Sequence, residues 1–385
     1  MVPKGWEKKY LKDILSGPIR NGFSPVASDK ETGFWILSLG SLGDEGINVT
    51  EIKPVEPIDR VLQTQLSHGD FLVSRSNTPD KVGRSIRFQG EIENCSYPDL
   101  MMKFRIDENK AEPEFIEQKL KNSDVRSYFT SCAAGSSATM VKINKGILEK
   151  TPLLLPNIKE QKKIAHILST WDKAITTTEK LLANSQQQKK ALMQELLTGK
   201  KRLPGFSGKW DDFYLGDIAR ITTGSSNRQD SYLYGKYTFF DRSEDVRSSD
   251  RYLFDCEAII VPGEGQDFIP KYFSGKFDLH QRTYAIMDFP TCDGKFLFYI
   301  IHFFRGHFLS QAVGSTVKSL RLPMFQKMRL HLPTLIEQKK IATTLSIADQ
   351  EIETLKQKLN HLKQEKKALM QQLLTGKRRV KTEAA

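Results

Sequence analysis

The feature that most constrains this chain is a repeat of 48 residues. Shifting the sequence against itself by 177 positions aligns residues 155–202 with residues 332–379 without a gap, and 27 of the 48 positions are identical. Agreement over so long a stretch indicates an internal duplication. A chain of 385 residues is also too long for one compact core. We therefore expect two domains.

Each copy of the repeat has the pattern of a long helix. Both copies begin with Leu-Pro, and Asn157 or Thr334 then stands three residues before Glu160 or Glu337, which is the spacing of a reciprocal capping box. Apolar residues follow at alternating steps of four and three, as in the heptad pattern of a coiled coil. The pattern predicts two helices of about 41 residues, each roughly 60 Å long.

The ends and the seam of these helices carry further signals. Gly199 and Gly376 stand where a helix would end. Trp171 falls on the apolar seam and is expected in the core. Lys189 and Lys366 fall on the same seam, where burial of a lysine is costly. We expect the packing to loosen at these lysines or to admit a partner.

The segments that precede the helices diverge, but they open alike. Trp6 and Trp210 occupy equivalent places, and we expect both to pack in a core or against a helix. The first opening contains Trp6, Tyr10, Leu11, Asp13, Ile14 and Gly17, and the second contains Trp210, Tyr214, Leu215, Asp217, Ile218 and Gly224. The predicted order is a variable domain over residues 1–156, a helix over 157–199, a linker over 200–208, a second variable domain over 209–333, a second helix over 334–376 and a basic tail over 377–385.

Both variable domains read as mixed α+β. Short β-type runs, punctuated by Gly, Pro and Asn, alternate with short helical segments. The β-type runs are residues 34–39, 70–74, 85–88, 237–240 and 258–261, and the helical segments are residues 114–121 and 297–304.

Taken together, these motifs resemble one family along the full chain. The pattern LPxxxEQxxIAxxL begins both helices, Trp-x3-Tyr-Leu-x-Asp-Ile opens both domains, and the order variable, helical, variable, helical is kept. The sequence resembles the specificity subunits of type I restriction-modification systems (the HsdS family). The resemblance implies two target recognition domains, each reading one half of a bipartite DNA site. Two long antiparallel helices would then form a coiled coil with pseudo-twofold symmetry and fix the gap between the half-sites.

The resemblance also implies partners and the absence of catalysis in this chain. Double-stranded DNA, two modification (methyltransferase) subunits docked on the helices and, in some complexes, restriction subunits are expected. S-adenosylmethionine, ATP and Mg would be bound by those partner subunits, and no cofactor by this chain.

Charge is distributed unevenly along the chain. Of the net +12, the helical residues 157–202 carry +6 and residues 334–385 carry +5, so the variable domains are almost neutral overall. This helix charge is compatible with DNA, with a partner or with a solvated face. Within the second domain, residues 294–336 contain six basic residues and no acidic one. That segment is a candidate DNA-facing region.

Two Gly-Ser/Thr loops that end in a basic residue suit contacts with DNA phosphates. One runs over residues 135–142 to Lys142, and the other runs over residues 314–318, with Ser315 and Lys318, and is followed by Arg321. Backbone amides and hydroxyls in such loops position a protein on DNA without specifying sequence.

Base readers are sought among side chains that match base edges in the major groove. Arginine fits guanine, and asparagine or glutamine fits adenine. The candidates of the first domain are Arg20 and Asn21, then Arg75, Ser76, Asn77 and Thr78, then Lys81 and Arg84. Those of the second domain are Arg242, Ser243, Gln281 and Arg282, with Lys271 as a phosphate contact.

Other classes of site lack support in the sequence. The cysteines Cys95, Cys132, Cys256 and Cys292 form no CxxC pair, and the histidines show no ligand spacing, so we assign no metal. No apolar run approaches the length of about 18 residues that a membrane helix needs. With no signal peptide pattern, we expect a cytoplasmic protein.

Three alternatives to a recognition subunit fit the sequence less well. A DNA amino-methyltransferase needs a Pro-Pro-aromatic motif, and the sequence has no Pro-Pro. A Mg-dependent nuclease of the PD…ExK type could use Asp99 with Glu108 and Lys110, but residues 107–110 read as a polar turn rather than a rigid strand. A coiled-coil scaffold without a DNA role would not explain why the domains diverge while the helices stay nearly identical. We therefore assign no catalytic residue.

Overall fold

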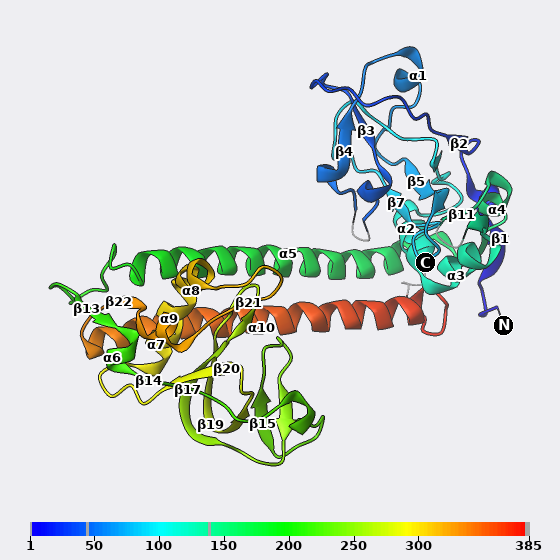
Figure 1. The fold of residues 1–385 in the computed structure, drawn as a ribbon. Coiled ribbons are helices and arrows are strands. Elements are labelled where there is room, and N and C mark those ends of the chain that lie inside the picture. The colour runs from blue at the N-terminus through cyan, green and yellow to red at the C-terminus, as the bar shows by residue number, and fades with distance from the viewer. Residues whose placement is uncertain (1, 44–45, 138–139, 382–385) are drawn as a thin grey trace. The chain divides into compact units, whose positions relative to one another are not determined.

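A computed structural model describes residues 2–43, 46–137 and 140–381 of the chain (Figure 1). The last four residues of the predicted basic tail, 382–385, lie outside this range. The chain divides into two compact units, one of Met1–Thr177 with Leu359–Ala385 and the other of Thr178–Lys358. Each unit holds one mixed α+β domain and a part of both long helices.

The two predicted long helices are present. Helix α5 covers Ile158–Leu196 and helix α10 covers Leu335–Leu373, each with 39 residues. Gly199 and Gly376 follow the helix ends with φ of +68° and +72°, the left-handed conformation that glycine adopts without strain. None of the helices within the described part of the chain is both long and apolar enough to cross a membrane.

Within each unit, α5 and α10 run antiparallel. In the first unit Asp172 of α5 pairs with Lys366 of α10. In the second unit Lys189 of α5 pairs with Asp349 of α10. The two lysines on the seam are thus held by aspartates of the opposite helix, which accounts for their position without loose packing. These paired positions are 177 residues apart in the repeat, so the same ion pair occurs in both units.

The repeated Glu-Gln at the helix starts joins each helix to its surroundings. Glu160, 2% exposed, accepts two hydrogen bonds from the Arg379 guanidinium at 2.6 and 2.7 Å, and Glu337, 0% exposed, accepts two from Arg202. Asn157 caps the backbone N–H of Glu160 at 2.9 Å, as predicted. In place of the predicted reciprocal hydrogen bond from the backbone N–H of Asn157, the Glu160 carboxylate binds Arg379.

The neighbouring glutamines tie each long helix to the domain that precedes it. Gln161 donates to the Pro156 carbonyl at 2.8 Å and accepts from the backbone N–H of Glu112 at 2.9 Å. Gln338 repeats this with Pro333 at 2.9 Å and Asp293 at 3.0 Å. Both glutamines are 2% exposed. The motif LPxxxEQ is therefore a joint between helix and domain.

Tryptophans fill the same joints. Trp6 and Trp210 are 5% and 4% exposed and belong to the two main cores, as predicted. Those cores extend onto the long helices through residues such as Leu168 and Leu345. Trp171 was expected in the core, but it is only half-buried.

The first domain contains short strands and helices. Its strands are β1 Glu7–Tyr10, β2 Arg20–Asn21, β3 Trp35–Leu37, β4 Ile52–Pro54, β5 Phe71–Ser74, β6 Ser76–Asn77, β7 Ser85–Arg87, β8 Cys95–Ser96, β9 Met101–Phe104, β10 Ala134–Ser137, β11 Met140–Lys142 and β12 Pro152–Leu155. Its helices are α1 Asp59–Leu62, α2 Pro113–Lys121, α3 Ser123–Cys132 and α4 Lys145–Glu149, with 3₁₀ turns η1 Leu11–Ile14, η2 Leu39–Ser41 and η3 Val49–Glu51.

The second domain has longer strands. They are β13 Asp211–Tyr214, β14 Arg220–Thr223, β15 Tyr237–Phe240, β16 Arg247–Ser249, β17 Phe254–Pro262, β18 Glu264–Gly265, β19 Lys271–Leu279, β20 Thr283–Met287, β21 Lys318–Ser319 and β22 Arg329–Leu332. Its helices are α6 Leu215–Ile218, α7 Gly294–Phe303, α8 Gly306–Gln311 and α9 Leu322–Gln326, with the 3₁₀ turn η4 Arg228–Asp230.

The two domains share one sheet topology. In the second domain the order is β14-β20-β17-β19-β15-β16, with β15 parallel to β19. In the first domain β2-β9-β5-β7 form one sheet and β4-β3-β8 another, with β3 parallel to β8. The first domain thus splits into β7 and β8 what the second keeps as the single strand β19. The first and last strands also pair in each domain, β1 with β12 and β13 with β22.

Candidate nucleic-acid interface

Shared topology brings the same three connections together in each domain. These are the loop after β2 or β14, the connection after β5 or β17, and the turn before β9 or β20. In the second domain, the loop after β15 joins them. The predicted contact residues fall mainly on these connections.

In the first domain, Arg20 lies beside a buried carboxylate. It lines a cavity of about 280 Å³ with Lys103 and Arg105. Asp70, 1% exposed, binds the Lys103 ammonium at 3.0 Å and Arg105 Nε at 2.5 Å. This carboxylate fixes two cations beside Arg20 and offsets part of their charge. Asn21 is the exposed neighbour of Arg20 on β2.

The segment after β5 has mixed roles. Arg75 Nη1 reaches the Asp99 carbonyl at 3.5 Å, beside the turn before β9. Asn77 Oδ1 accepts from the backbone of Thr78 at 2.9 Å, which shapes the loop. Ser76 is 1% exposed, and its hydroxyl does not reach the surface. Arg75 thereby links the connection after β5 with the turn before β9.

Three further basic residues of the first domain lie around the same segment. Lys81 is exposed, and Lys142 is exposed on β11 opposite Ser76 of β6. Arg84 donates to the Leu42 carbonyl at 3.0 Å. Arg84 also lines a cavity of about 250 Å³ with Arg126.

In the second domain, three arginines converge on one open pocket. Arg228, Arg242 and Arg282 line a cavity of about 220 Å³ with Gln281 and two carboxylates. Glu264 binds Arg282 at 2.6 Å and Arg242 at 3.3 Å, and Asp241 lies 3.7 Å from Arg228. The three guanidinium side chains are all more than half exposed. Such an oriented cluster suits phosphate oxygens or guanine edges.

His280 also lines this pocket. Burial lowers the pKa of its imidazole below the usual value near 6.5. Its Nδ1 accepts from the backbone N–H of Arg282 at 3.1 Å, so the ring shapes the turn that carries Gln281 and Arg282.

Ser243 and Lys271 organise the loop after β15. The backbone N–H of Ser243 donates to Asp241 at 2.8 Å. Lys271 Nζ donates to the carbonyls of Ser243 at 2.7 Å and Glu244 at 2.9 Å. Burial lowers the pKa of the Lys271 ammonium. In this arrangement Lys271 supports the loop that carries Arg242.

The loop before α9 reaches the same region. Its strand β21 pairs with β18, so that Lys318 lies opposite Gly265 and Ser319 opposite Glu264. Ser315 is exposed before this strand, and Arg321 is exposed at the start of α9. Gly314 has a φ of +120°, which allows the turn.

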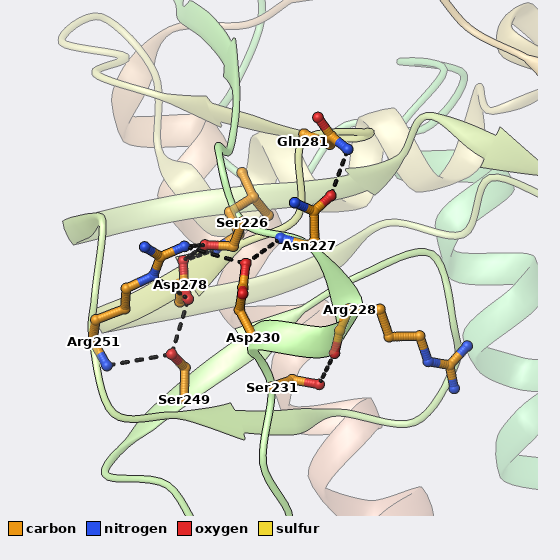
Figure 2. Close-up of polar contacts among 10 residues, drawn as sticks. Ser226, Asn227, Arg228, Asp230, Ser231, Ser249, Arg251, Asp278 and Gln281 are labelled. Atoms are coloured by element: carbon orange, nitrogen blue, oxygen red, sulfur yellow. Dashed lines mark hydrogen bonds and ion pairs between the residues drawn. The ribbon is translucent and has the colours of Figure 1, made fainter.

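The loop over residues 226–231 was missed by the sequence analysis. It follows β14 and carries Asn227 and Arg228, and Asn227 Oδ1 accepts a hydrogen bond from Gln281 Nε2 at 2.6 Å (Figure 2). The matched openings of the two domains end at Gly224, just before this loop. A search of the divergent residues directly after that glycine would have found it.

A buried carboxylate holds this loop in place. Asp278, 0% exposed, accepts hydrogen bonds from the hydroxyls of Ser226 at 2.5 Å and Ser249 at 2.9 Å (Figure 2). Arg251 lies 3.5 Å from the same carboxylate and donates to Ser226 Oγ at 2.7 Å. Asp230 accepts from the backbone N–H of Asn227 at 2.7 Å. The loop is thus fixed at both ends.

Duplicated domains with basic, polar loops, joined to two long helices, define a protein that reads nucleic acid at two places. A family model described as "Type I restriction modification DNA specificity domain" matches residues 3–184 and 207–364. The chain belongs to this family. It is a specificity subunit, a DNA-recognition component rather than the enzyme of its complex.

Individual relatives agree with this assignment. A putative type I restriction enzyme MjaX specificity subunit from Methanocaldococcus jannaschii is 26% identical over 99% of this chain and 95% of its own length. The EcoDI specificity subunit of Escherichia coli is 29% identical over 43% of this chain and 37% of its own length.

Solved structures show the same fold. The crystal structure of a type I restriction-modification S subunit from M. genitalium matches with a TM-score of 0.67 at 14% identity, covering 97% of this chain and 99% of that one. A chain from a study of assembly and conformational transition of the type I R-M system matches with a TM-score of 0.57 at 15% identity, covering 97% and 98%.

Among the residues that the structure describes, no group of three or more His, Cys, Asp or Glu is arranged to hold a metal ion. Asp107, at the start of the predicted polar turn that contains Glu108 and Lys110, accepts a hydrogen bond from the backbone N–H of Asn109 at 3.1 Å. The hydrogen bond to Asn109, more than any other contact, lowers the pKa of this carboxyl.

Proposed function

We propose that the first domain contacts one half of a bipartite DNA site through the loops beside Arg20 and Arg75, and that the second contacts the other half through the pocket of Arg228, Arg242 and Arg282. The observation that carries this proposal is the shared topology, which gathers corresponding loops in two domains whose loop sequences differ. Common scaffolds with different loops suit two readers of different sequences.

The long helices suit a spacer and a docking platform. The identical stretches of the repeat include residues that are exposed in both copies, such as Lys190 and Gln194 on α5 and Lys367 and Gln371 on α10. Packing within the chain does not require the identity of exposed residues. Two equivalent exposed surfaces fit two copies of one partner, so we propose that two modification subunits dock there. Restriction subunits would join through them.

The chemistry of the complex would then belong to the partners. S-adenosylmethionine would bind to the modification subunits, and ATP and Mg to subunits that restrict DNA. This chain would supply the sequence preference and the spacing.

Sequencing of methylated sites in the host genome tests the proposal. Cells with the gene should carry methylated adenines or cytosines in one motif, made of two short half-sites separated by a spacer of fixed length. Cells without it should lose methylation at that motif alone. An unchanged methylation pattern after deletion of the gene, in cells that express the modification subunit, would contradict the proposal.

A further inference from the structure

A polar pair links the same two connections in each domain. In the second domain Gln281 donates to Asn227 at 2.6 Å, joining the loop after β14 to the turn before β20. In the first domain Ser24 Oγ donates to Asp99 at 2.5 Å, and the Asp99 backbone N–H donates back to Ser24 Oγ at 3.2 Å. This pair joins the loop after β2 to the turn before β9.

Close backbone contact fixes the place of both pairs. A Cβ on Gly22 would lie 2.1 Å from the Tyr97 carbonyl oxygen, and a Cβ on Gly224 would lie 1.7 Å from that of Leu279. Only glycine lets the chain pass so near the neighbouring turn. The fold therefore sets where each pair stands, while the identity of its members differs between the domains.

Two carboxylates hold the Asn227–Gln281 pair of the second domain in place. Asp230 accepts from the backbone N–H of Asn227, Asp278 accepts from the hydroxyl of the preceding Ser226, and Gln281 extends from the opposite turn (Figure 2). Gln281 is exposed and Asn227 is half-buried. Fixing a surface amide costs conformational entropy, which a merely solvated side chain would not need to lose. Preorganised polar groups at a surface suit recognition.

The pair also keeps capacity for a ligand. The bond between the two amides uses one N–H of Gln281 and one lone pair of Asn227, so each amide retains both donors and acceptors. An amide matches the N6 and N7 edge of adenine in the major groove. A carboxylate such as Asp99 only accepts, and it matches the amino group of cytosine or adenine.

We propose that the Asn227–Gln281 pair reads an adenine in the half-site of the second domain, and that the Ser24–Asp99 pair is its counterpart in the first domain, reading an amino-bearing base. This inference rests on the proposed function and names the reading residues within it. The arginines around each pair then supply phosphate and neighbouring contacts. Because the two pairs differ in chemistry, the two half-sites differ in sequence.

The test uses the full chain assembled with its modification subunits and a randomised DNA duplex library, from which bound sequences are selected and read. The wild-type complex should select a bipartite motif. Gln281→Ala and Asn227→Ala should each relax one adenine position of one half-site by roughly 5- to 150-fold, the equivalent of about 1–3 kcal/mol. The other half-site should stay unchanged.

The first domain provides the reciprocal control. Asp99→Asn and Ser24→Ala should alter one position of the other half-site only.

Gln281→Glu serves as the conservative variant, since it changes an exposed group by one atom and leaves the buried network around Asp278 intact. Thermal unfolding of each variant shows that its domain is folded.

The outcomes separate the inference from the proposed function. If folded Gln281→Glu and Asn227→Ala complexes select the wild-type motif with unchanged discrimination, the inference is wrong and the proposed function stands. If the variants bind all sequences more weakly by the same factor, the pair contacts phosphates and the inference is wrong. The inference is also wrong if discrimination is lost at a position other than an adenine. If the wild-type complex selects no motif, the proposed function itself fails.

Discussion

Two glutamates are the most constrained charged residues of the long helices. Glu160 and Glu337 are almost fully buried at the first turns of α5 and α10, and each meets an arginine that follows the end of the other helix, Arg379 or Arg202. A buried carboxylate near a helix start gains from the N-terminal dipole and from a bidentate guanidinium. Its removal leaves the arginine without its counter-charge.

We expect Glu337→Ala to lower the free energy of unfolding of the second unit by about 2–4 kcal/mol. The lower part of this range is favoured, because the Arg202 side chain is 24% exposed and gains water on loss of its partner. Glu160→Ala should do the same in the first unit. Urea unfolding of the full chain measures both values.

The matched control is Glu353→Ala, an exposed glutamate of α10 whose side chain accepts from Gln357 at 3.0 Å. It should change the free energy of unfolding by no more than about 0.5 kcal/mol. Equal effects of Glu337→Ala and Glu353→Ala would show that the buried pair adds nothing to the joint.

At the residue level, local sequence patterns predicted which residues are buried better than they predicted which residues contact each other. Trp6 and Trp210 were predictable because they hold equivalent places in a duplicated opening. Asn227 and Gln281 lie 54 positions apart, and only the sheet order brings them together. Ser76 reads as polar in the sequence, yet β6 pairs with β11 and buries it.

At the scale of elements, the coiled-coil seam contains a charged pair in each unit. Asp349 accepts from Lys189 and also from Tyr299 Oη at 2.7 Å, which comes from α7 of the second domain. In the first unit Asp172 accepts from Lys366 and from Gln118 Nε2 at 3.0 Å, which comes from α2. Each pair therefore connects the two helices with one domain helix. Polar pairs at a seam commonly specify register.

We expect a double-mutant cycle on Lys189→Met and Asp349→Leu to give a coupling energy of about 1–2 kcal/mol. The value is discounted because the two side chains are 22% and 41% exposed. The double variant should be more stable than the sum of the single effects, since apolar residues suit the seam. Thermal and urea unfolding provide the measurement.

The pair Lys201–Glu195, 3.4 Å apart and 68% and 47% exposed, offers a control cycle. Its coupling energy should stay below about 0.5 kcal/mol. If the coupling energy of Lys189 and Asp349 is no larger than this, the seam pair does not specify the register of the two helices.

Element prediction from the sequence worked where periodicity was long. The two 39-residue helices follow from the heptad pattern, and the runs at residues 70–74 and 237–240 are strands β5 and β15. The parallel pairing of β3 with β8 and of β15 with β19 could not be read from the sequence. Pairing depends on contacts between strands about 40 or more residues apart, and no local pattern encodes them.

At the scale of the whole molecule, the proposal that the helices set the spacer leads to a defined deletion. Removing residues 178–184 of α5 together with residues 352–358 of α10 takes one heptad from each helix and preserves the seam phase, because Ser185 and Glu351 contact each other at 2.8 Å directly beside both segments. Seven residues correspond to about 10 Å of helix, or about 3 base pairs of DNA.

The deletion variant should therefore select the same half-sites with a spacer shorter by about 3 base pairs, as read by selection from a randomised duplex library. As a control, substituting the two heptads by others of equal length should leave the spacer unchanged. An unaltered spacer in the deletion variant would contradict the role of the helices as a spacer.

Exchange of one domain tests the modularity of recognition. The joint of the first domain uses Glu160 and Gln161 of α5 and Arg379 beyond the end of α10, so replacing residues 1–156 by the equivalent domain of a relative keeps these three residues. The hybrid should change one half-site and keep the other half-site and the spacer. Methylated-site sequencing in cells that express the hybrid with the modification subunits gives the readout. A change in both half-sites would mean that the two domains do not read DNA independently.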